Sequence, residues 1–400
     1  MDAGPSGAPH DDASARAPFV GSLPIAAMLV GEEEVRAGAL AVVRKSVDVA
    51  VLGAEGPRSG PVAALRDVAW LSDADLRLGG SRQSPILVFR GLVSGKRRRA
   101  GVFLSEAFLP AGEPAVIEAS HCVSGRHLAW LEPGGHELVR RTRETSARFK
   151  LGTVDPDATL ACGDTLDWVL VDRDGDHDVV TARAHQDGGA APREALFRDA
   201  EDDETREVLA LPRGDEATFL RVGQAGSLSL RRIGTPARPP RTLATRVDRE
   251  DDVVAALAGD AGVVVVVTHE EDVGCDGGAP TPRVDAVAVD DTRDTLVTLA
   301  AATCGRERGP FFVNTLADGS WAIAWVERAA TRGRTTAPIV GVRHAILQRA
   351  ALPLTGETSL SADGVADAKC GKKRCAFVAL ERPRGQDDSQ PEPLRAHFYP

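Results

Sequence analysis

The sequence has no excess of positive charge. Its 48 lysine and arginine residues are outnumbered by 58 aspartate and glutamate residues, so the formal net charge is −10 at pH 7. A protein that binds nucleic acid needs a basic surface to displace the counterions of the phosphate backbone. The charge balance therefore argues against a nucleic-acid partner.

A long apolar run is missing as well. A membrane-spanning helix needs roughly 18 or more consecutive apolar residues. The longest candidate, residues 18–31, is interrupted by Gly21, Ser22 and Pro24. A secretion signal would begin with basic residues, whereas two aspartates precede this stretch. We therefore expect no transmembrane segment, and we do not interpret this stretch as a signal peptide.

The short motifs of common catalytic sites are absent too. The sequence contains no Gly-x-Ser-x-Gly elbow, no His-Glu-x-x-His helix and no glycine loop that could cradle a phosphate. These absences favour a protein that binds without catalysis. A pair of catalytic carboxylates lining a central channel stays open as an alternative, because such a pair forms in space and not along the chain.

What the sequence does have is a recurring hairpin. Three segments share the pattern of a short apolar strand that ends in glutamate: residues 128–132, 323–327 and 377–381. A fourth, residues 166–172, ends in aspartate, and weaker versions occur at 47–52, 86–89, 217–222 and 263–268. A turn and a second strand follow each of them. Alternating apolar and polar residues between glycine-bearing turns predict β-hairpins.

The hairpins recur roughly every 40 to 60 residues, which is close to the period of a propeller blade. Each repeat also has room for two flanking strands, such as residues 115–118 and 147–151 around the hairpin that contains Trp130. An array of immunoglobulin-like domains would need about 100 residues per repeat. We therefore predict an all-β fold, a single β-propeller of about seven or eight four-stranded blades.

On these repeats the chain resembles the β-propeller superfamily, particularly uncharacterised secreted propellers of bacteria. The resemblance extends from about residue 20 to residue 400 and rests on the strand pattern. The Trp-Asp dipeptide and the double-glycine kelch pattern are absent, and Asp318-Gly-Ser-Trp321 only half matches a sialidase-type Asp box. The resemblance therefore implies a fold and no particular activity.

The chain divides into two parts. Residues 1–17 are small, polar and proline-bearing, so we predict a disordered tether, of the kind that follows a removed secretion or lipoprotein signal. Residues 18–400 form the predicted propeller. Its last repeat lacks an outer strand, and we expect Pro24 to Val30 to pair with that repeat and close the ring.

Four aspartates between the two strands of one hairpin form a candidate metal site. Asp172, Asp174, Asp176 and Asp178 surround a glycine, and calcium prefers six to eight oxygen ligands. The segment resembles the calcium loops of integrin-type blades, although its last aspartate comes early. We prefer to interpret the segment as a plain hairpin turn, because such turns also favour aspartate and glycine. Calcium is the one cofactor that the sequence suggests.

The six cysteines are expected to form disulfides. Cys370 and Cys375 flank a turn, where paired strand residues come within reach of an S–S bond. The remaining cysteines are assigned as Cys122 with Cys162 and Cys275 with Cys304, but the sequence does not fix this choice, because connectivity cannot be derived from sequence alone. Disulfides imply an extracytoplasmic location: periplasmic, lipoprotein or secreted. Reduced, buried thiols in a cytosolic protein are the alternative.

Two further charged segments are expected to be solvated. His269, Glu270 and Asp272 belong to an acidic loop on the face that we predict to bind ligands; a histidine beside carboxylates could also bind a metal or act as a base. Residues 96–99, Lys-Arg-Arg-Arg, are predicted to form a basic turn between two strands.

These observations favour a non-catalytic module of the cell envelope that binds a ligand or protein, or serves as a scaffold. The expected partner is a protein or a glycan, and the expected state is a monomer. The alternative is an envelope glycan hydrolase or lyase with carboxylates facing the channel.

Overall fold

The computed structural model describes residues 25–399, apart from gaps at 31–34, 44–45, 54–55, 69–70, 118–119, 153, 155–157, 172–178, 186–189, 199–202, 214–215, 234–238, 248–250, 260–261, 276–279, 291–292, 317, 330–338, 348–353, 363–366, 371–374 and 381–393. All side chains before Leu40 and all after Leu347 lie outside the described part. Every regular element in these residues is a β-strand. No helical membrane span is found among them.

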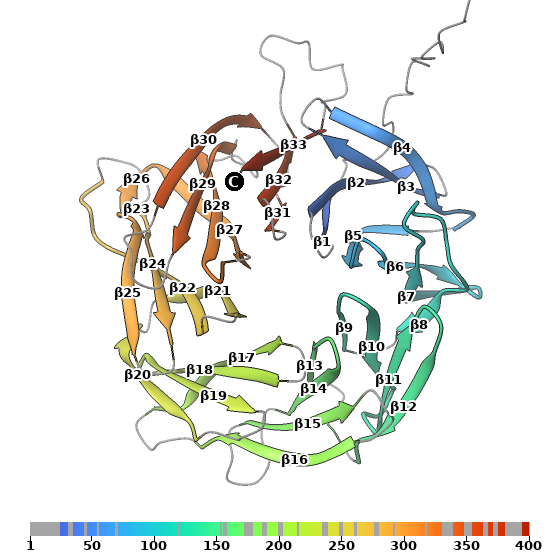
Figure 1. The fold of residues 1–400 in the computed structure, drawn as a ribbon, viewed down its shortest axis with the longest axis horizontal. Helices are drawn as coiled ribbons and strands as arrows, with labels where there is room; N and C mark the ends of the chain where they lie inside the picture. Colours follow the sequence, from blue (N-terminus) through green and yellow to red (C-terminus); the bar gives the residue numbers. More distant parts are fainter. Residues whose placement is uncertain are drawn as a thin grey trace, which may run out of the picture.

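The strands form antiparallel sheets that follow one another around a ring (Figure 1). The first sheet contains β1 (Ile25–Val30), β2 (Val35–Val43), β3 (Ser46–Gly53) and β4 (Gly56–Leu65). The second contains β5 (Leu71–Gly80), β6 (Pro85–Val93), β7 (Lys96–Phe103) and β8 (Ala115–Ile117). The third contains β9 (His121–Val123), β10 (His127–Leu131), β11 (Glu137–Thr142) and β12 (Ser146–Lys150). The fourth contains β13 (Thr159–Cys162), β14 (Leu166–Val171), β15 (Val179–His185) and β16 (Ala190–Phe197).

The second half of the ring repeats this order. The fifth sheet contains β17 (Thr205–Arg213), β18 (Glu216–Gly223), β19 (Ser227–Ile233) and β20 (Arg241–Arg246). The sixth contains β21 (Asp252–Gly259), β22 (Gly262–His269), β24 (Arg283–Val289) and β25 (Asp294–Ala300), and β23 (Pro280–Thr281) pairs separately with β26 (Thr303–Cys304). The seventh contains β27 (Arg306–Thr315), β28 (Trp321–Ala329), β29 (Ile339–Leu347) and β30 (Leu354–Ala362). The last contains β31 (Asp367–Cys370), β32 (Cys375–Leu380) and β33 (Leu394–Tyr399).

The first strand of each sheet lies nearest the axis, and the last strand lies at the rim (Figure 1). Neighbouring first strands contact one another, as β9 contacts β13, β17 contacts β21 and β21 contacts β27. The protein is therefore a single all-β propeller, as predicted. The expected number of blades stays a prediction, because the sheets at the two ends of the chain are described mainly by their backbones.

The core consists of apolar layers between successive sheets. In β22, Val264 and Val266 pack toward the seventh sheet, whereas Val263, Val265 and Val267 pack toward the fifth. Adjacent residues of a strand point to opposite faces, so a strand that is buried on both faces needs a continuous apolar run. This explains why the valine run at this position is a strand.

The predicted closure of the ring is wrong. β1 is hydrogen bonded to β2 along its whole length, from Ile25 opposite Leu40 to Val30 opposite Val35. In the described residues the last sheet therefore has three strands and does not include β1. A hairpin with the next strand closes a far shorter loop than pairing with the opposite end of the chain, so its entropic cost is lower. The first and last sheets instead pack side by side, with β1 against β31 and β3 against β33.

Residues 1–17 and Pro24 lie outside the described residues, so the tether stays a prediction.

Candidate ligand-binding groove

An open groove lies between the second and third sheets. Its volume is about 600 Å³. The walls come from β7 and β8 on one side, and from β10, β11, β12 and the turn before β12 on the other. The lining residues are Arg98, Ala115, Val116, Trp130, Glu132, Val139, Arg141, Thr142, Arg143, Glu144, Thr145, Ser146 and Arg148.

Strand register places the third sheet's lining residues on one face. Trp130 lies opposite Val139, and Val139 lies opposite Arg148, so the three form one row across β10, β11 and β12. Arg141 stands two residues after Val139 and therefore points to the same side. The inner part of this face is apolar and packs against the second sheet, with Trp130 and Val139 in the cluster. The outer part carries the arginines and forms the groove.

The turn between β11 and β12 is held by a threonine. The Thr142 hydroxyl accepts hydrogen bonds from the backbone N–H groups of Glu144, at 3.2 Å, and Thr145, at 2.9 Å. Such a side-chain cap fixes a tight turn. Arg143 and Glu144 at its tip are exposed.

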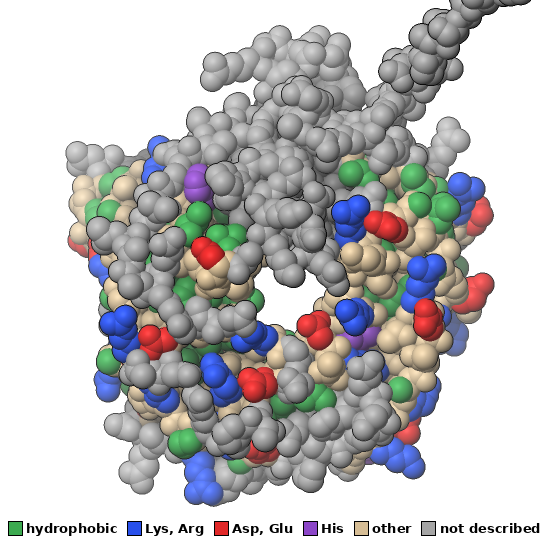
Figure 2. Space-filling model, in the orientation of Figure 1, with side chains coloured by type: hydrophobic (Ala, Val, Ile, Leu, Met, Phe, Trp, Pro, Cys, Tyr) green, Lys and Arg blue, Asp and Glu red, His purple; other side chains and the backbone are tan. Residues whose placement is uncertain are grey.

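The groove is rich in positive charge although the protein is acidic. Four arginines face two glutamates in its lining. Arg148 is ion-paired with Glu132, at 3.3 Å, and Arg141 donates to the backbone carbonyl of Glu113, at 3.0 Å. Within the described part of the chain, Arg143 has no ion-pair partner. Elsewhere basic and acidic side chains are interspersed around the rim and the central opening (Figure 2).

The basic run at residues 96–99 contributes to this groove. It was expected to form a solvated turn, but it is the start of strand β7, and Arg98 is half-buried in the groove wall. The sequence could not indicate this role, because the opposite wall comes from another sheet.

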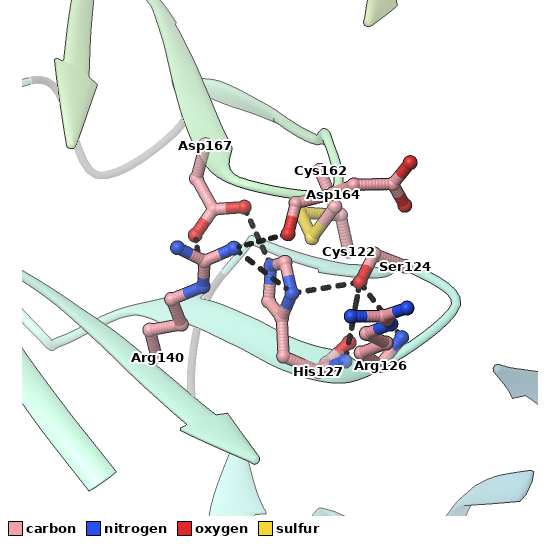
Figure 3. The surroundings of a disulfide bond; sticks show 8 residues. All are labelled: Cys122, Ser124, Arg126, His127, Arg140, Cys162, Asp164 and Asp167. Atoms are coloured by element: carbon pink, nitrogen blue, oxygen red, sulfur yellow. Dashed lines mark hydrogen bonds and ion pairs between the residues drawn. A yellow bond between two sulfur atoms is a disulfide. The ribbon is translucent and has the colours of Figure 1, made fainter. Parts of the chain in front are cut away.

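A buried polar cluster joins the third and fourth sheets (Figure 3). His127 Nε2 lies 2.7 Å from Asp167 Oδ1, and Ser124 Oγ lies 2.7 Å from His127 Nδ1. Arg140 donates to the backbone carbonyls of Thr165, at 2.7 Å, and Asp164, at 3.0 Å. His127 and Asp167 are almost completely buried.

The connectivity of Ser124, His127 and Asp167 is that of a nucleophile, base and acid. Arg140 Nη2, however, lies 3.1 Å from the same Nδ1 that would take the serine proton. A guanidinium only donates, so it needs this nitrogen as an acceptor. Protonation of Nδ1 would turn that contact into a repulsion. The cluster is therefore suited to joining two sheets rather than to activating Ser124.

Two predicted disulfides are present. Cys122 is bonded to Cys162, and Cys275 to Cys304. The first joins the innermost strands of the third and fourth sheets, beside the polar cluster. The backbones of Cys370 and Cys375 are directly paired across β31 and β32. Their side chains lie outside the described residues, so this disulfide stays a prediction.

The structure places His269 differently from the sequence prediction. His269 is the last residue of β22 and is buried, with Nδ1 2.6 Å from Asp251 Oδ2 and Nε2 2.9 Å from Asp285 Oδ2. It is therefore part of a buried charge cluster and not of a solvated loop. Strand pairing brings it there, because β22 lies between β21, which begins directly after Asp251, and β24, which contains Asp285. Glu270 and Asp272 are exposed, as expected, and their role in binding stays a prediction.

The candidate calcium site, formed by Asp172, Asp174, Asp176 and Asp178, lies between β14 and β15 and outside the described residues. Calcium binding there stays a prediction.

No family model and no curated protein matches the sequence. Among solved structures, dipeptidyl peptidase 4 of Porphyromonas gingivalis matches with 10% identity and a TM-score of 0.51, over 89% of this chain and 56% of its own. A post-proline cleaving enzyme of Rickettsia typhi matches with 8% identity and a TM-score of 0.48, over 91% and 58%. A periplasmic gluconolactonase of Pseudomonas aeruginosa matches with 12% identity and a TM-score of 0.39, over 93% and 98%. The chain thus spans little more than half the length of these two peptidases, and the likeness shows the propeller fold alone.

Proposed function

We propose that this protein is a non-catalytic binding module of the cell envelope, and that the groove between its second and third sheets binds a carboxylate-bearing glycan. The observation that carries the proposal is a cluster of four arginines around an open groove in a protein of net charge −10. Guanidinium groups bind carboxylates through paired, charge-assisted hydrogen bonds.

The size and lining of the groove favour a short oligosaccharide. Its volume of about 600 Å³ lies in the range of small-ligand sites, roughly 300–1,000 Å³. The hydroxyls of Thr145 and Ser146 can exchange hydrogen bonds with sugar hydroxyls. A protein partner would instead bury a broad surface, about 800 Å² on each side.

The lining supports binding over hydrolysis. A glycosidase needs two carboxyl groups flanking the scissile bond, roughly 5–9.5 Å apart. Of the two glutamates here, Glu132 is engaged by Arg148. Glu144 alone remains at the exposed turn.

The two disulfides support an extracytoplasmic location, because disulfides persist in oxidising compartments. Alkylation of intact host cells, followed by mass spectrometry, would test the location. Thiols that react at all four of these cysteines before any reduction would contradict it.

The sheets support a ring of eight blades: the described strands form seven sheets of four strands and one of three.

Calorimetry with a uronic acid tetrasaccharide tests the function. We expect binding that weakens with added salt, and Arg143→Ala should weaken it about tenfold through loss of one charge-assisted contact. Arg293→Ala removes another exposed arginine, from the turn between β24 and β25, and should leave binding unchanged.

A neutral tetrasaccharide and an acidic peptide of equal charge complete the experiment. Equal affinity for the neutral sugar would overturn the role of the arginines. Tighter binding of the peptide would replace the glycan with a protein partner.

A further inference from the structure

Three potential metal ligands and a histidine meet where the third and fourth sheets join (Figure 3). The sulfur atoms of Cys122 and Cys162 and a carboxylate oxygen of Asp167 all lie within 4.8 Å of one another. His127 Nε2 is 2.7 Å from Asp167 Oδ1. The four side chains come from four strands, β9, β13, β14 and β10, so backbone pairing holds them in place.

One oxygen of this cluster is not saturated. Asp167 is fully buried, and its Oδ2 has no hydrogen-bond partner; the nearest cation is Arg140, whose Nε lies 3.4 Å away. Buried carboxylate oxygens normally accept hydrogen bonds or bind a cation. The contact of His127 with Oδ1 is the kind of interaction that orients a ligating carboxylate.

We propose that reduction of the Cys122–Cys162 disulfide converts this cluster into a zinc site. Cys122, Cys162 and Asp167 are the ligands, and water takes the fourth position. Zinc is bound tetrahedrally by cysteine sulfur, histidine nitrogen and aspartate oxygen. Ligand atoms in such a site are about 3.3–3.8 Å apart for bonds of roughly 2.0–2.3 Å, so small movements suffice from the observed spacing.

The conversion takes two steps, reduction of the disulfide and then binding of zinc. A dithiol reductant supplies two electrons and two protons, so that the S–S bond breaks, two cysteine thiols form and the reductant becomes a disulfide. Zinc then binds as the two thiols lose their protons to solvent.

The local charge favours the metal-bound form. Two thiolates and Asp167 carry three negative charges, and zinc carries two positive charges. Arg140 supplies the third positive charge and is itself fixed by the carbonyls of Asp164 and Thr165. The buried group is then neutral overall, which avoids the cost of an uncompensated charge. The two sheets stay linked in both states, through S–S when oxidised and through S–Zn–S when reduced.

Cobalt binding to the full chain tests the proposal. Cys275, Cys304, Cys370 and Cys375 are replaced by serine, so that only the proposed pair remains. After reduction, one equivalent of Co²⁺ should produce a thiolate-to-cobalt charge-transfer band that Zn²⁺ removes. The oxidised protein should show no such band. Asp167→Asn should weaken cobalt binding at least tenfold, and Cys122→Ser should abolish the band.

Ser124→Ala serves as the matched control, because Ser124 contacts His127 and none of the three ligands. It should leave the band unchanged. Circular dichroism is recorded on every sample. A reduced protein that keeps its β-sheet spectrum but shows no band overturns the proposal. A band that appears only when this spectrum is lost overturns it too, because it reports chelation by unfolded chain.

Discussion

Glu327 is a buried anion shared by three arginines at the end of β28. Its side chain is 1% exposed, with Oε1 3.0 Å from Arg308 Nε and 3.3 Å from Arg343 Nε. Arg306 donates to Oε2. Burial alone would raise the pKa of Glu327, but the hydrogen bonds from Arg306 and Arg308, with the charges of Arg308 and Arg343, hold it below its ordinary value. A carboxyl with a lowered folded pKa stabilises the protein fully above its unfolded pKa, and this contribution is lost as the pH falls through the lower, folded pKa.

Glu327→Gln should therefore be strongly destabilising at neutral pH. It leaves three arginines without their shared anion, and we expect the free energy of unfolding at pH 7 to fall by about 3–5 kcal/mol. The difference in free energy of unfolding between the variant and the wild type should be smaller at pH 3 than at pH 7. Urea unfolding at both pH values measures this. Glu307→Gln removes the same charge from an exposed position in β27 and should change stability by less than about 0.5 kcal/mol. Equal losses in the two variants would contradict this account.

At the scale of elements, the strands were predictable and their partners only partly so. All eight segments expected as core strands of hairpins are strands in the structure. Residues 115–118, however, were assigned to the hairpin of Trp130, and the strand there, β8, is the outer strand of the preceding sheet. The innermost strand of that hairpin's sheet is β9, with three half-buried residues and little apolar pattern. Period-two alternation indicates that a strand exists; it does not indicate whether the strand ends one sheet or begins the next.

The site was harder to predict for a related reason. Arg98 and Arg143 belong to different sheets, so the groove exists only once two blades pack together. Acidic neighbours in the sequence favoured a solvated His269, whereas strand register brings it between Asp251 and Asp285. After a hairpin pair had been assumed, the four remaining cysteines still allowed three pairings. The predicted pairs Cys122–Cys162 and Cys275–Cys304, which join neighbouring cysteines along the chain, are the ones present.

The turn between β18 and β19 depends on a glycine. Gly226 has φ +85°, and a Cβ there would lie 1.7 Å from the carbonyl oxygen of Val247. We expect Gly226→Ala to cost at least about 2 kcal/mol, through the strained φ and the collision with backbone. Gly95→Ala is the matched control: its φ is +77°, but a Cβ there meets nothing within 4 Å. It should cost only about 1 kcal/mol. Urea unfolding separates the two, and equal losses would show that the Val247 contact has no effect.

At the scale of the whole molecule, stability depends on links between neighbouring sheets. Apolar layers fill the space between successive sheets, for example between the fifth and sixth and between the sixth and seventh. Covalent and ionic links reinforce some of these boundaries. The Cys122–Cys162 disulfide and the contact of His127 with Asp167 lie between the third and fourth sheets. Cys275–Cys304 links the segment after β22 to the strand that precedes the seventh sheet. The stability of such a ring is therefore limited by the weakest boundary between neighbouring sheets.

The boundary between the first and last sheets contains β1, which contacts β31 on one side and β5 on the other. Deletion of residues 1–30 removes this strand, separates the two sheets and leaves β2 with an unpaired edge that favours aggregation. Deletion of residues 1–17 removes no described strand. We expect the shorter deletion to keep the melting temperature within about 2 °C of the full chain, and the longer one to lower it by about 5 °C or more, which corresponds to the loss of a few kcal/mol. Differential scanning calorimetry, with light scattering to detect aggregation, measures both effects. Equal melting temperatures for the two deletions would mean that β1 does not hold the ring together, and closure would have to depend on the contacts of β3 and β4 with β33.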